Sequence, residues 1–240
     1  MVNSYTGLSR HYDLIMTSGY YDYDDYARTL ASVLKGRREV LELGVGTGLV
    51  CERLLALGEP PGLSLTGIDH TEEMLVQARR RLAGSVRLVR QDVLQMAIPP
   101  TFDAAFSVGG IWFYIHDQHA VEDVFCSHLL NEEDNVLALR NLHAAMKPGG
   151  LLALASQGPH HSYERDLPGG LVYAQDVRAA AGDRFVKDYY VRSHDEVVAH
   201  QRCEFRLFAR EQATRLLEHC GFRFEGTAAD GLFRLYARLP

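Results

Sequence analysis

The chain has 240 residues, of which 47% are hydrophobic and 23% are charged. This composition is typical of a globular protein and excludes disordered, collagen-like and fibrous classes. The formal net charge of -6 disfavours a nucleic-acid partner, because nucleic-acid-binding domains carry an excess of basic residues. The most apolar stretch, residues 104–115, is shorter than the roughly 18 residues of a membrane span, and the first residues lack the apolar run of a secretory signal. We therefore expect a cytoplasmic protein that acts on a small molecule, without a membrane.

The chain's four cysteines predict neither a metal site nor a redox pair. Cys51, Cys126, Cys203 and Cys220 are scattered and form no Cys-x-x-Cys motif. We expect them to be reduced and buried, as free cysteines commonly are.

A segment rich in tyrosine and aspartate precedes the main fold, at residues 20–26. From Tyr23 the apolar residues recur at helical spacing, which predicts an amphipathic helix that ends near Lys35. Its aspartates would be costly to bury without partners. The helix is therefore expected to belong to a lid, residues 1–36, rather than to the core.

From residue 38 the sequence alternates between strand, turn and helix. The expected strands are 39–43, 63–68, 86–89, 102–108 and 151–156, and the expected helices are 49–57, 71–82 and 131–146. Continuous apolar strands that alternate with helices are typical of a parallel sheet covered on both faces. Residues 37–157 are therefore expected to form a doubly wound α/β core.

The pattern changes after Gln157. Residues 170–178, 184–192 and 196–209 look extended and have no helix between them, which predicts an antiparallel β insertion over 158–209. A helix at 210–220 and strands at 222–225 and 232–238 follow, within 210–240. We interpret residues 1–240 as a single domain.

Three acids and a glycine turn stand at the ends of successive predicted strands. Ligands of parallel sheets bind at this carboxyl edge, where Glu42, Asp69 and Asp92 are expected to lie with Gly44, Gly46 and Gly48. Leu49 stands where the dinucleotide fingerprint needs glycine or alanine, and the Walker motif is absent. Glu42 would repel a pyrophosphate and suits a ligand with positive charge. An NAD-dependent oxidoreductase remains an alternative that these residues disfavour.

Four motifs resemble those of class I S-adenosylmethionine-dependent methyltransferases. They are LELGVGTG at 41–48, GIDHTEEML at 67–75, QDV at 91–93 and LHAAMKPGG at 142–150. The resemblance implies a Rossmann-like, seven-stranded sheet whose last strand is antiparallel, and S-adenosyl-L-methionine as cofactor.

The resemblance also implies a role for each cofactor-binding residue. The glycines, with Val45, would let the backbone approach the homocysteine part, and Glu42 would lie close by. Asp69 would bind both ribose hydroxyls, while His70, Met74, Asp92 and Val93 would surround the adenine. Ser107 would flank the methionine end.

The amino-terminal SRHYDLI segment, the β insertion and the short chain are similar to small-molecule methyltransferases. Glycine methyltransferases and amino-sugar N,N-dimethyltransferases are the groups most similar in layout. In those groups the tyrosine at the position of Tyr12 contacts the carboxylate end of the cofactor, and the first helices act as a lid. Residues 109–131 are longer and more aromatic than these groups usually have.

The acceptor site is predicted from residues that follow the strands. His116 is our candidate general base, because it follows an aromatic run at a carboxyl edge, and Tyr114 is a second catalytic candidate. A surface or helix-capping role for His116 is an equal alternative. The residues expected to contact the acceptor are Tyr20, Tyr21, Trp112, Tyr114, His160 and His194. His116, Asp117 and His119 lack a third well-spaced ligand, so we expect no metal.

The sequence therefore predicts methyl transfer to a small metabolite, with an amine nitrogen of natural-product metabolism favoured. O- or C-methylation, a non-methylating protein that keeps the cofactor fold, and a protein or RNA methyltransferase are the alternatives. The antiparallel insertion is a candidate homodimer surface.

Overall fold

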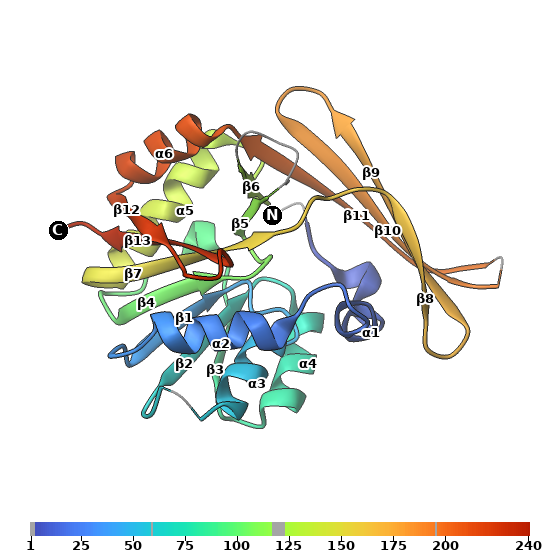
Figure 1. The fold of residues 1–240 in the computed structure, drawn as a ribbon, viewed down its shortest axis with the longest axis horizontal. Coiled ribbons are helices and arrows are strands. Elements are labelled where there is room, and N and C mark those ends of the chain that lie inside the picture. Colours follow the sequence, from blue (N-terminus) through green and yellow to red (C-terminus); the bar gives the residue numbers. More distant parts are fainter. Residues whose placement is uncertain (1–2, 59, 117–122, 195) are drawn as a thin grey trace.

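The fold has two parts, an α/β half and a set of long antiparallel strands that projects from it (Figure 1). The computed structural model describes residues 3–58, 60–116, 123–194 and 196–240. Asp117 and His119 lie outside the described residues. None of the helices within those ranges is long and apolar enough to cross a membrane.

The sheet of the α/β half has the predicted doubly wound topology. Its order is β3 (Arg87–Arg90), β2 (Ser64–Asp69), β1 (Glu39–Leu43), β4 (Phe102–Ser107), β7 (Met146–Gln157), β13 (Phe233–Arg238) and β12 (Phe222–Thr227). The strands from β3 to β7 are parallel, and β13 is antiparallel to both of its neighbours. The chain reverses its direction of travel across the sheet between β1 and β4, where such folds bind ligands.

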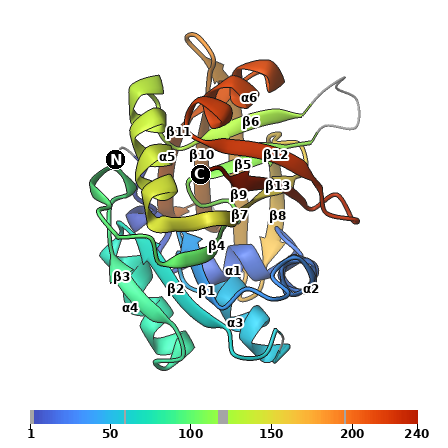
Figure 2. The same ribbon diagram turned by 90° about the vertical axis from the view of Figure 1, so that its left-hand side faces the viewer.

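Helices cover both faces of this sheet (Figure 2). On one face lie α2 (Tyr23–Val33), α3 (Leu49–Ala56) and α4 (Glu72–Leu82), and on the other lie α5 (Glu132–Ala145) and α6 (Arg210–His219). The alternation of side chains along β7 explains the two layers. Ala153 and Ala155 belong to the first hydrophobic cluster, whereas Leu152 and Leu154 belong to the second.

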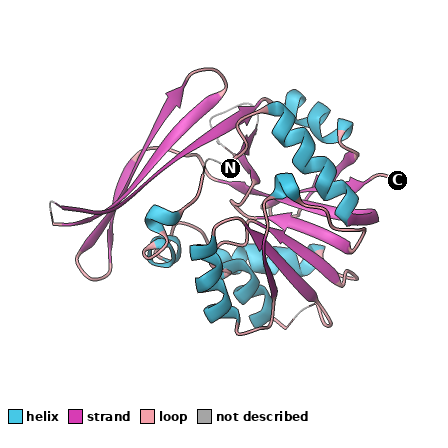
Figure 3. Ribbon diagram, turned by 180° about the vertical axis from the view of Figure 1, so that it is seen from behind, coloured by secondary structure: helices cyan, strands magenta, loops and turns pink. Residues whose placement is uncertain are grey.

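A second sheet starts at the carboxyl end of β7 (Figure 3). Its further strands are β5 (Trp112–Ile115), β6 (Val124–Ser127), β11 (Glu196–Phe208), β10 (Arg184–Ser193), β9 (Leu171–Ala180) and β8 (Tyr163–Leu167). β5 runs parallel to β7, with Tyr114 opposite Ser156 and Ile115 opposite Gln157. The remaining pairs are antiparallel, so the antiparallel pairing predicted for the insertion is confirmed.

The sequence reading missed β5, β6 and β8 and placed the start of β7 too late. β5 gives no alternating signal because its aromatic residues are buried on both sides: Trp112, Phe113 and Tyr114 are at most 2% exposed. β7 begins at Met146, where the sequence predicts the end of a helix and a turn.

The amino-terminal segment contains a 3-10 helix, η1 (Thr6–Leu8), and the short helix α1 (Tyr12–Thr17), followed by α2. Asp22 caps α2 by accepting the N–H of Asp25 at 2.9 Å. Tyr23 and Tyr26 are buried, and the hydroxyl of Tyr26 donates to the carbonyl of Ser156 at 2.7 Å. The tyrosines of α2 therefore join the core while its acids stay exposed, and its part in a lid is not confirmed. For η1 and α1 the lid stays a prediction.

Candidate active site

The turn after β1 can be made only by glycines. Gly44, Gly46 and Gly48 have φ angles of 70°, 54° and 83°, a region that L side chains rarely adopt. A Cβ on Gly44 would lie 2.7 Å from the Cα of Gly110, and one on Gly48 would lie 2.8 Å from a methyl group of Leu82. The missing side chains leave room for a ligand beside Gly44 and Gly46, which line a pocket.

Asp69, the last residue of β2, is held in place by this turn. One of its carboxylate oxygens accepts the N–H of Gly46 at 2.9 Å, and the other accepts the N–H of Thr71 at 2.8 Å. Burial raises the pKa of Asp69, and both N–H donors and His70 partly offset that shift. The fixed carboxylate is a strong acceptor for hydroxyl groups.

A small pocket brings the turn and Asp69 together with residues from distant segments. Its volume is about 50 Å³, and it is lined by Asn3, Tyr5, Tyr12, Gly44, Gly46, Asp69, His70, Thr71, Met74, Gly109, Gly110, Ile111 and His128. Of the residues that the sequence assigns to the cofactor, the structure thus gathers Tyr12, Gly44, Gly46, Asp69, His70 and Met74.

The other residues assigned to the cofactor surround this pocket without lining it. The side chain of Val45 packs against Gly67 of β2, because a Cβ added to Gly67 would lie 2.7 Å from a methyl group of Val45. Gly48 faces Leu82. Val93 is fully buried in the core. Their parts in cofactor binding stay predictions.

Asp92 and Ser107 each accept a hydrogen bond from a backbone N–H group. Asp92 caps the 3-10 helix η2 (Val93–Gln95) by accepting the N–H of Leu94 at 2.9 Å. The hydroxyl of Ser107 accepts the N–H of Ile111 at 3.2 Å and shapes the loop after β4. Contact of either residue with the cofactor also stays a prediction.

Glu42 lies beneath the glycine turn, 2% exposed, and accepts a hydrogen bond from the Cys51 thiol at 2.8 Å. Burial raises the pKa of Glu42 to about 8, and the Cys51 bond offsets only part of this. A cation in the pocket would favour the ionised carboxylate.

The sequence reading missed His128, Asn3 and Tyr5. The amide of Asn3 donates to Nδ1 of His128 at 3.1 Å, so the imidazole hydrogen is on Nε2. Burial lowers the pKa of His128 to about 3, and a hydrogen bond to the backbone of Gly109 offsets part of this shift. The Gly-Gly pair after β4 was a usable signal for this part of the site, because Gly110 cannot carry a side chain: a Cβ would lie 2.2 Å from the carbonyl of Leu43.

Comparison with known proteins identifies the kind of domain in which this pocket lies. Residues 40–150, which contain the glycine turn and Asp69, match a family described as methyltransferase domain. Residues 40–150 are a class I S-adenosylmethionine-dependent methyltransferase domain. The chain is 24% identical to a putative methyltransferase, YqeM, from Bacillus subtilis. The match extends over 235 residues, 94% of this chain and 89% of the relative. It is 29% identical over 145 residues to a glycine/sarcosine N-methyltransferase from Parasynechococcus marenigrum, but this covers only 58% of the chain and 44% of that relative.

Solved methyltransferase structures share the fold. The amino pentose methyltransferase CalS10 from Micromonospora echinaspora, solved with S-adenosylmethionine bound, superposes with a TM-score of 0.68 at 21% identity, over 95% of this chain and 96% of the other. The sugar N-methyltransferase KedS8 from Streptoalloteichus gives a TM-score of 0.72 at 18% identity, over 95% and 93%.

The residues of this methyltransferase fit S-adenosylmethionine. Glycines leave the cradle free of side chains, the Asp69 carboxylate can accept ribose hydroxyls, and the carboxyl of Glu42 suits the positive sulfonium. Asn3, Tyr5 and Tyr12 close the pocket from the amino-terminal side.

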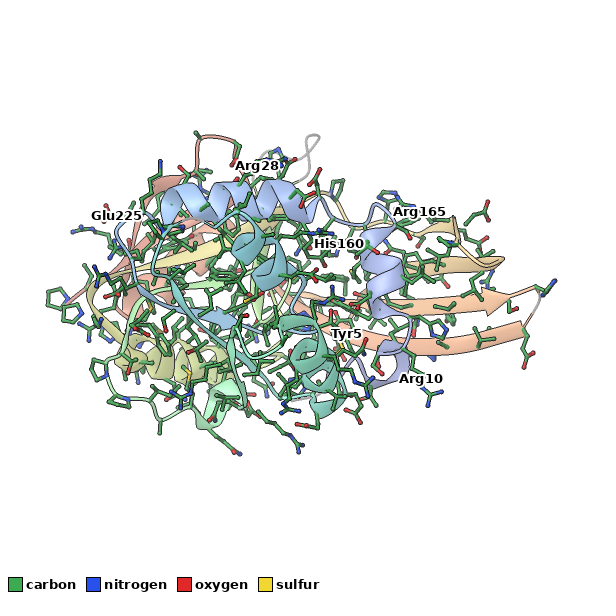
Figure 4. All side chains as sticks on the ribbon, turned by 90° about the horizontal axis from the view of Figure 1, so that it is seen from below. Tyr5, Arg10, Arg28, His160, Arg165 and Glu225 are labelled. Carbon is green, nitrogen blue, oxygen red and sulfur yellow. The ribbon has the colours of Figure 1, made fainter. Side chains whose placement is uncertain are left out.

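A second pocket of about 440 Å³ lies between the amino-terminal segment and the projecting strands. Tyr20, Tyr21, Gln157 and His160 line it, together with Gln175. It adjoins the cofactor pocket at Gly109, where a Cβ would lie 2.9 Å from Nε2 of Gln157 and 3.3 Å from the hydroxyl of Tyr21. Figure 4 shows His160 and Tyr5 beneath the helical amino-terminal segment.

His160 is bonded on one side only. The hydroxyl of Tyr21 donates to Oε1 of Gln157 at 2.8 Å, and Nε2 of His160 lies 3.1 Å from the same oxygen. Because an amide oxygen only accepts, Nε2 carries the hydrogen and Nδ1 is unprotonated. Nδ1 is buried and has no partner among the described residues, and burial lowers the pKa of His160 well below its usual range.

Three residues predicted to contact the acceptor, and His116, the candidate general base, lie elsewhere. Trp112 is fully buried and donates to Asn135 at 2.9 Å, and the Tyr114 hydroxyl bonds to that of Tyr236 in the core. His116 is exposed, pairs with Asp123 and lines a different pocket, and His194 lies at the exposed tip between β10 and β11. Alternation along β5 turns its aromatic side chains into sheet and helix packing instead of the site.

Proposed function

We propose that this methyltransferase methylates the nitrogen of a small-molecule amine. The observation that carries the proposal is the buried Nδ1 of His160, which has no hydrogen-bond partner among the described residues, on a residue that lines the same pocket as Tyr20 and Tyr21. Aromatic faces attract a cationic amine, and an ammonium must lose a proton before its nitrogen can attack. The similarity to a glycine/sarcosine N-methyltransferase and to a sugar N-methyltransferase, both named for transfer to nitrogen, supports an amine acceptor.

S-adenosylmethionine supplies the methyl group when bound, for an in-line displacement that needs alignment and a dry pocket. Nδ1 of His160 accepts the N–H of the amine and takes its proton. The Nε2–H of His128 donates to an oxygen of the bound molecules and so orients them. His128 and His160 both contact Phe113, with ring centroids at 6.1 Å and 5.6 Å, which fixes their relative positions.

We further propose that η1 and α1 move when the cofactor enters. The cofactor pocket of about 50 Å³ is far below the roughly 300 Å³ or more of small-molecule sites. Asp13 of α1 accepts the hydroxyl of Thr47 at 2.6 Å and pairs with Arg81 of α4, so it holds the segment against the core. Closed in this way, Tyr5 and Tyr12 exclude water from the site.

Methyl transfer from labelled S-adenosylmethionine to amines and to their hydroxyl counterparts tests the proposal. We expect transfer to amines, and a fall in kcat of about 100-fold or more in His160→Gln, the size of a lost general base. Affinity for S-adenosylhomocysteine should not change. His219→Gln, an exposed histidine of α6, is the control. Transfer to hydroxyls instead, or full activity in His160→Gln, would contradict the proposal.

A further inference from the structure

One lysine is buried in the wall of the acceptor site. Lys187 of β10 is 0% exposed. The chain has only two other lysines, Lys35 and Lys147. Its amine donates to the hydroxyl of Tyr20 and lies 5.0 Å and 4.9 Å from the ring centroids of Tyr20 and Tyr189. A buried lysine that is not paired with an acid is uncommon, because removing the charge from water is costly.

No carboxylate among the described residues pairs with Lys187. The neighbouring Asp188 is also buried, but its side chain is on the opposite face of the strand, where it pairs with Arg178 and His200. Lys147, in contrast, is exposed and pairs with Asp103 at 2.8 Å. The Lys187 amine therefore contacts the Tyr20 hydroxyl and the rings of Tyr20 and Tyr189, without a carboxylate partner among the described residues.

Tyr20 connects Lys187 to the acceptor pocket. Its ring lines the pocket of about 440 Å³, and its hydroxyl oxygen accepts from Lys187. The Tyr20 hydroxyl also shares a hydrogen bond with Tyr21, so a ligand that accepts from Tyr20 replaces that bond. An ammonium that donates to a hydroxyl polarises it and makes it a stronger donor. Nε2 of Gln157, on the same pocket, is a further buried donor without a partner among the described residues.

We propose that the methyl acceptor carries an anionic oxygen group, a carboxylate or a phosphate, which binds at the Tyr20 hydroxyl and is neutralised by Lys187. The inference rests on the proposed amine methylation and narrows its substrate to amines with an anionic group. The Tyr20 hydroxyl and the Gln157 amide donate to the anion, and the lysine supplies the counter-charge from behind.

The groups that face Lys187 define how it titrates. They are Tyr20 before α2, Tyr189 beside it on β10, Cys203 of β11, Cys126 of β6 and His160 after β7. Burial lowers the pKa of Lys187 to about 7, and the two cysteines oppose this shift. A bound anion favours the ammonium form and so raises the pKa. Anion affinity should therefore fall as the pH rises above about 7.

Nuclear magnetic resonance of lysine-labelled protein tests this directly, because only three side-chain signals arise. With the full chain saturated with S-adenosylhomocysteine, the Lys187 signal is titrated with pH alone, with acetate, and with inorganic phosphate. We expect acetate or phosphate to move the titration of Lys187 to higher pH, and the responding anion identifies the kind of group. Unchanged titration with both anions would overturn the proposal.

Two variants separate recognition from folding. Lys187→Met should weaken binding of the anion that shifts the Lys187 titration by about 10- to 100-fold, the range of a charge-assisted hydrogen bond. Tyr20→Phe should have the same effect and serves if Lys187→Met does not fold. Lys147→Met, which removes an exposed lysine, should leave anion binding unchanged. Equal anion binding by all three variants would overturn the inference.

Methyl transfer to matched pairs distinguishes this inference from the proposed function. Amino acids are compared with their amides, and phosphoethanolamine with ethanolamine. Transfer to the anionic members, lost in Lys187→Met, supports the inference. Transfer to the uncharged members alone overturns the inference but keeps amine methylation. If amines fail while Lys187 still responds to an anion, the proposed amine function fails and the anion site stands.

Discussion

The backbone N–H of Gly46 donates to the carboxylate of Asp69 at 2.9 Å, which ties the glycine turn after β1 to the end of β2. The same carboxylate is the acceptor that we predict for the ribose hydroxyls. Asp69→Asn keeps an oxygen but loses the charge, so we expect weaker binding of S-adenosylmethionine and S-adenosylhomocysteine, by about 1.5 to 3 kcal/mol. Calorimetry measures both. The exposed Asp176→Asn of β9 is the control, and retained affinity in Asp69→Asn would refute the ribose assignment.

Glu42 should make stability fall with rising pH. Burial raises the pKa of Glu42 to about 8 from 4.5, so the folded chain keeps a proton that the unfolded chain has lost between these values. The contribution is complete below about pH 4.5 and is lost as the pH rises to about 8, by at most about 1.4 kcal/mol per pH unit. Glu42→Gln should remove this slope. Urea unfolding at a series of pH values measures it, and an identical slope in both proteins would contradict the predicted shift.

Asp13→Asn should release the amino-terminal segment. The substitution removes the charge that pairs with Arg81 while leaving an oxygen for Thr47. We expect faster dissociation of S-adenosylhomocysteine in stopped-flow experiments, by about 3- to 10-fold for a partly exposed pair worth about 1 kcal/mol. Asp25→Asn, which removes an exposed pair with Arg28, is the matched control. Unchanged dissociation would argue against movement of α1.

Gly109→Ala should obstruct the passage between the two pockets. Its φ is 67°, and the added Cβ would lie 2.9 Å from Nε2 of Gln157. We expect the KM for the acceptor to rise about tenfold or more, since overpacking a close contact costs about 1 to 3 kcal/mol. Gly158→Ala has no atom within 4 Å of its added Cβ and should behave as the native enzyme. An unchanged acceptor KM in Gly109→Ala would place the passage elsewhere.

Trp112→Phe tests the structural role that the fold gives to this residue. The indole N–H donates to Asn135 in the fully buried core, so its loss should lower the free energy of unfolding by about 1 to 3 kcal/mol. Activity per folded molecule should not change. Denaturant unfolding and steady-state kinetics check the two statements, and an altered acceptor KM would return Trp112 to the acceptor site.

The sequence predicted the parts of the site that depend on local chemistry. The glycine turn and Asp69 are readable because a positive φ requires glycine and because a strand end fixes where an acid will lie. His128 was not readable, because it reaches the pocket through the pairing of β6 with β5 and through a bond from Asn3, 125 residues away. Lys187 was hidden similarly, since its burial depends on Tyr20, 167 residues away.

The same limit explains the acceptor residues that were wrong. Trp112 and Tyr114 have the aromatic character of a binding wall, but β5 enters a sheet, and its register decides which way each ring faces. His116 follows the same strand and ends beside Asp123. For Trp112, Tyr114 and His116, the residue type alone did not predict on which face of the sheet the side chain lies.

Because β7 pairs with β4 and β13 along its length and with β5 at Ser156 and Gln157, the two sheets have one strand in common. β5 therefore cannot melt alone without exposing the end of β7. Amide hydrogens of β5 and of the last residues of β7 should then exchange with solvent only when the α/β half also opens. We expect β5 and the α/β half to unfold together, so the free energy of opening should be the same for β5 and for the strands that carry the glycine turn and Asp69.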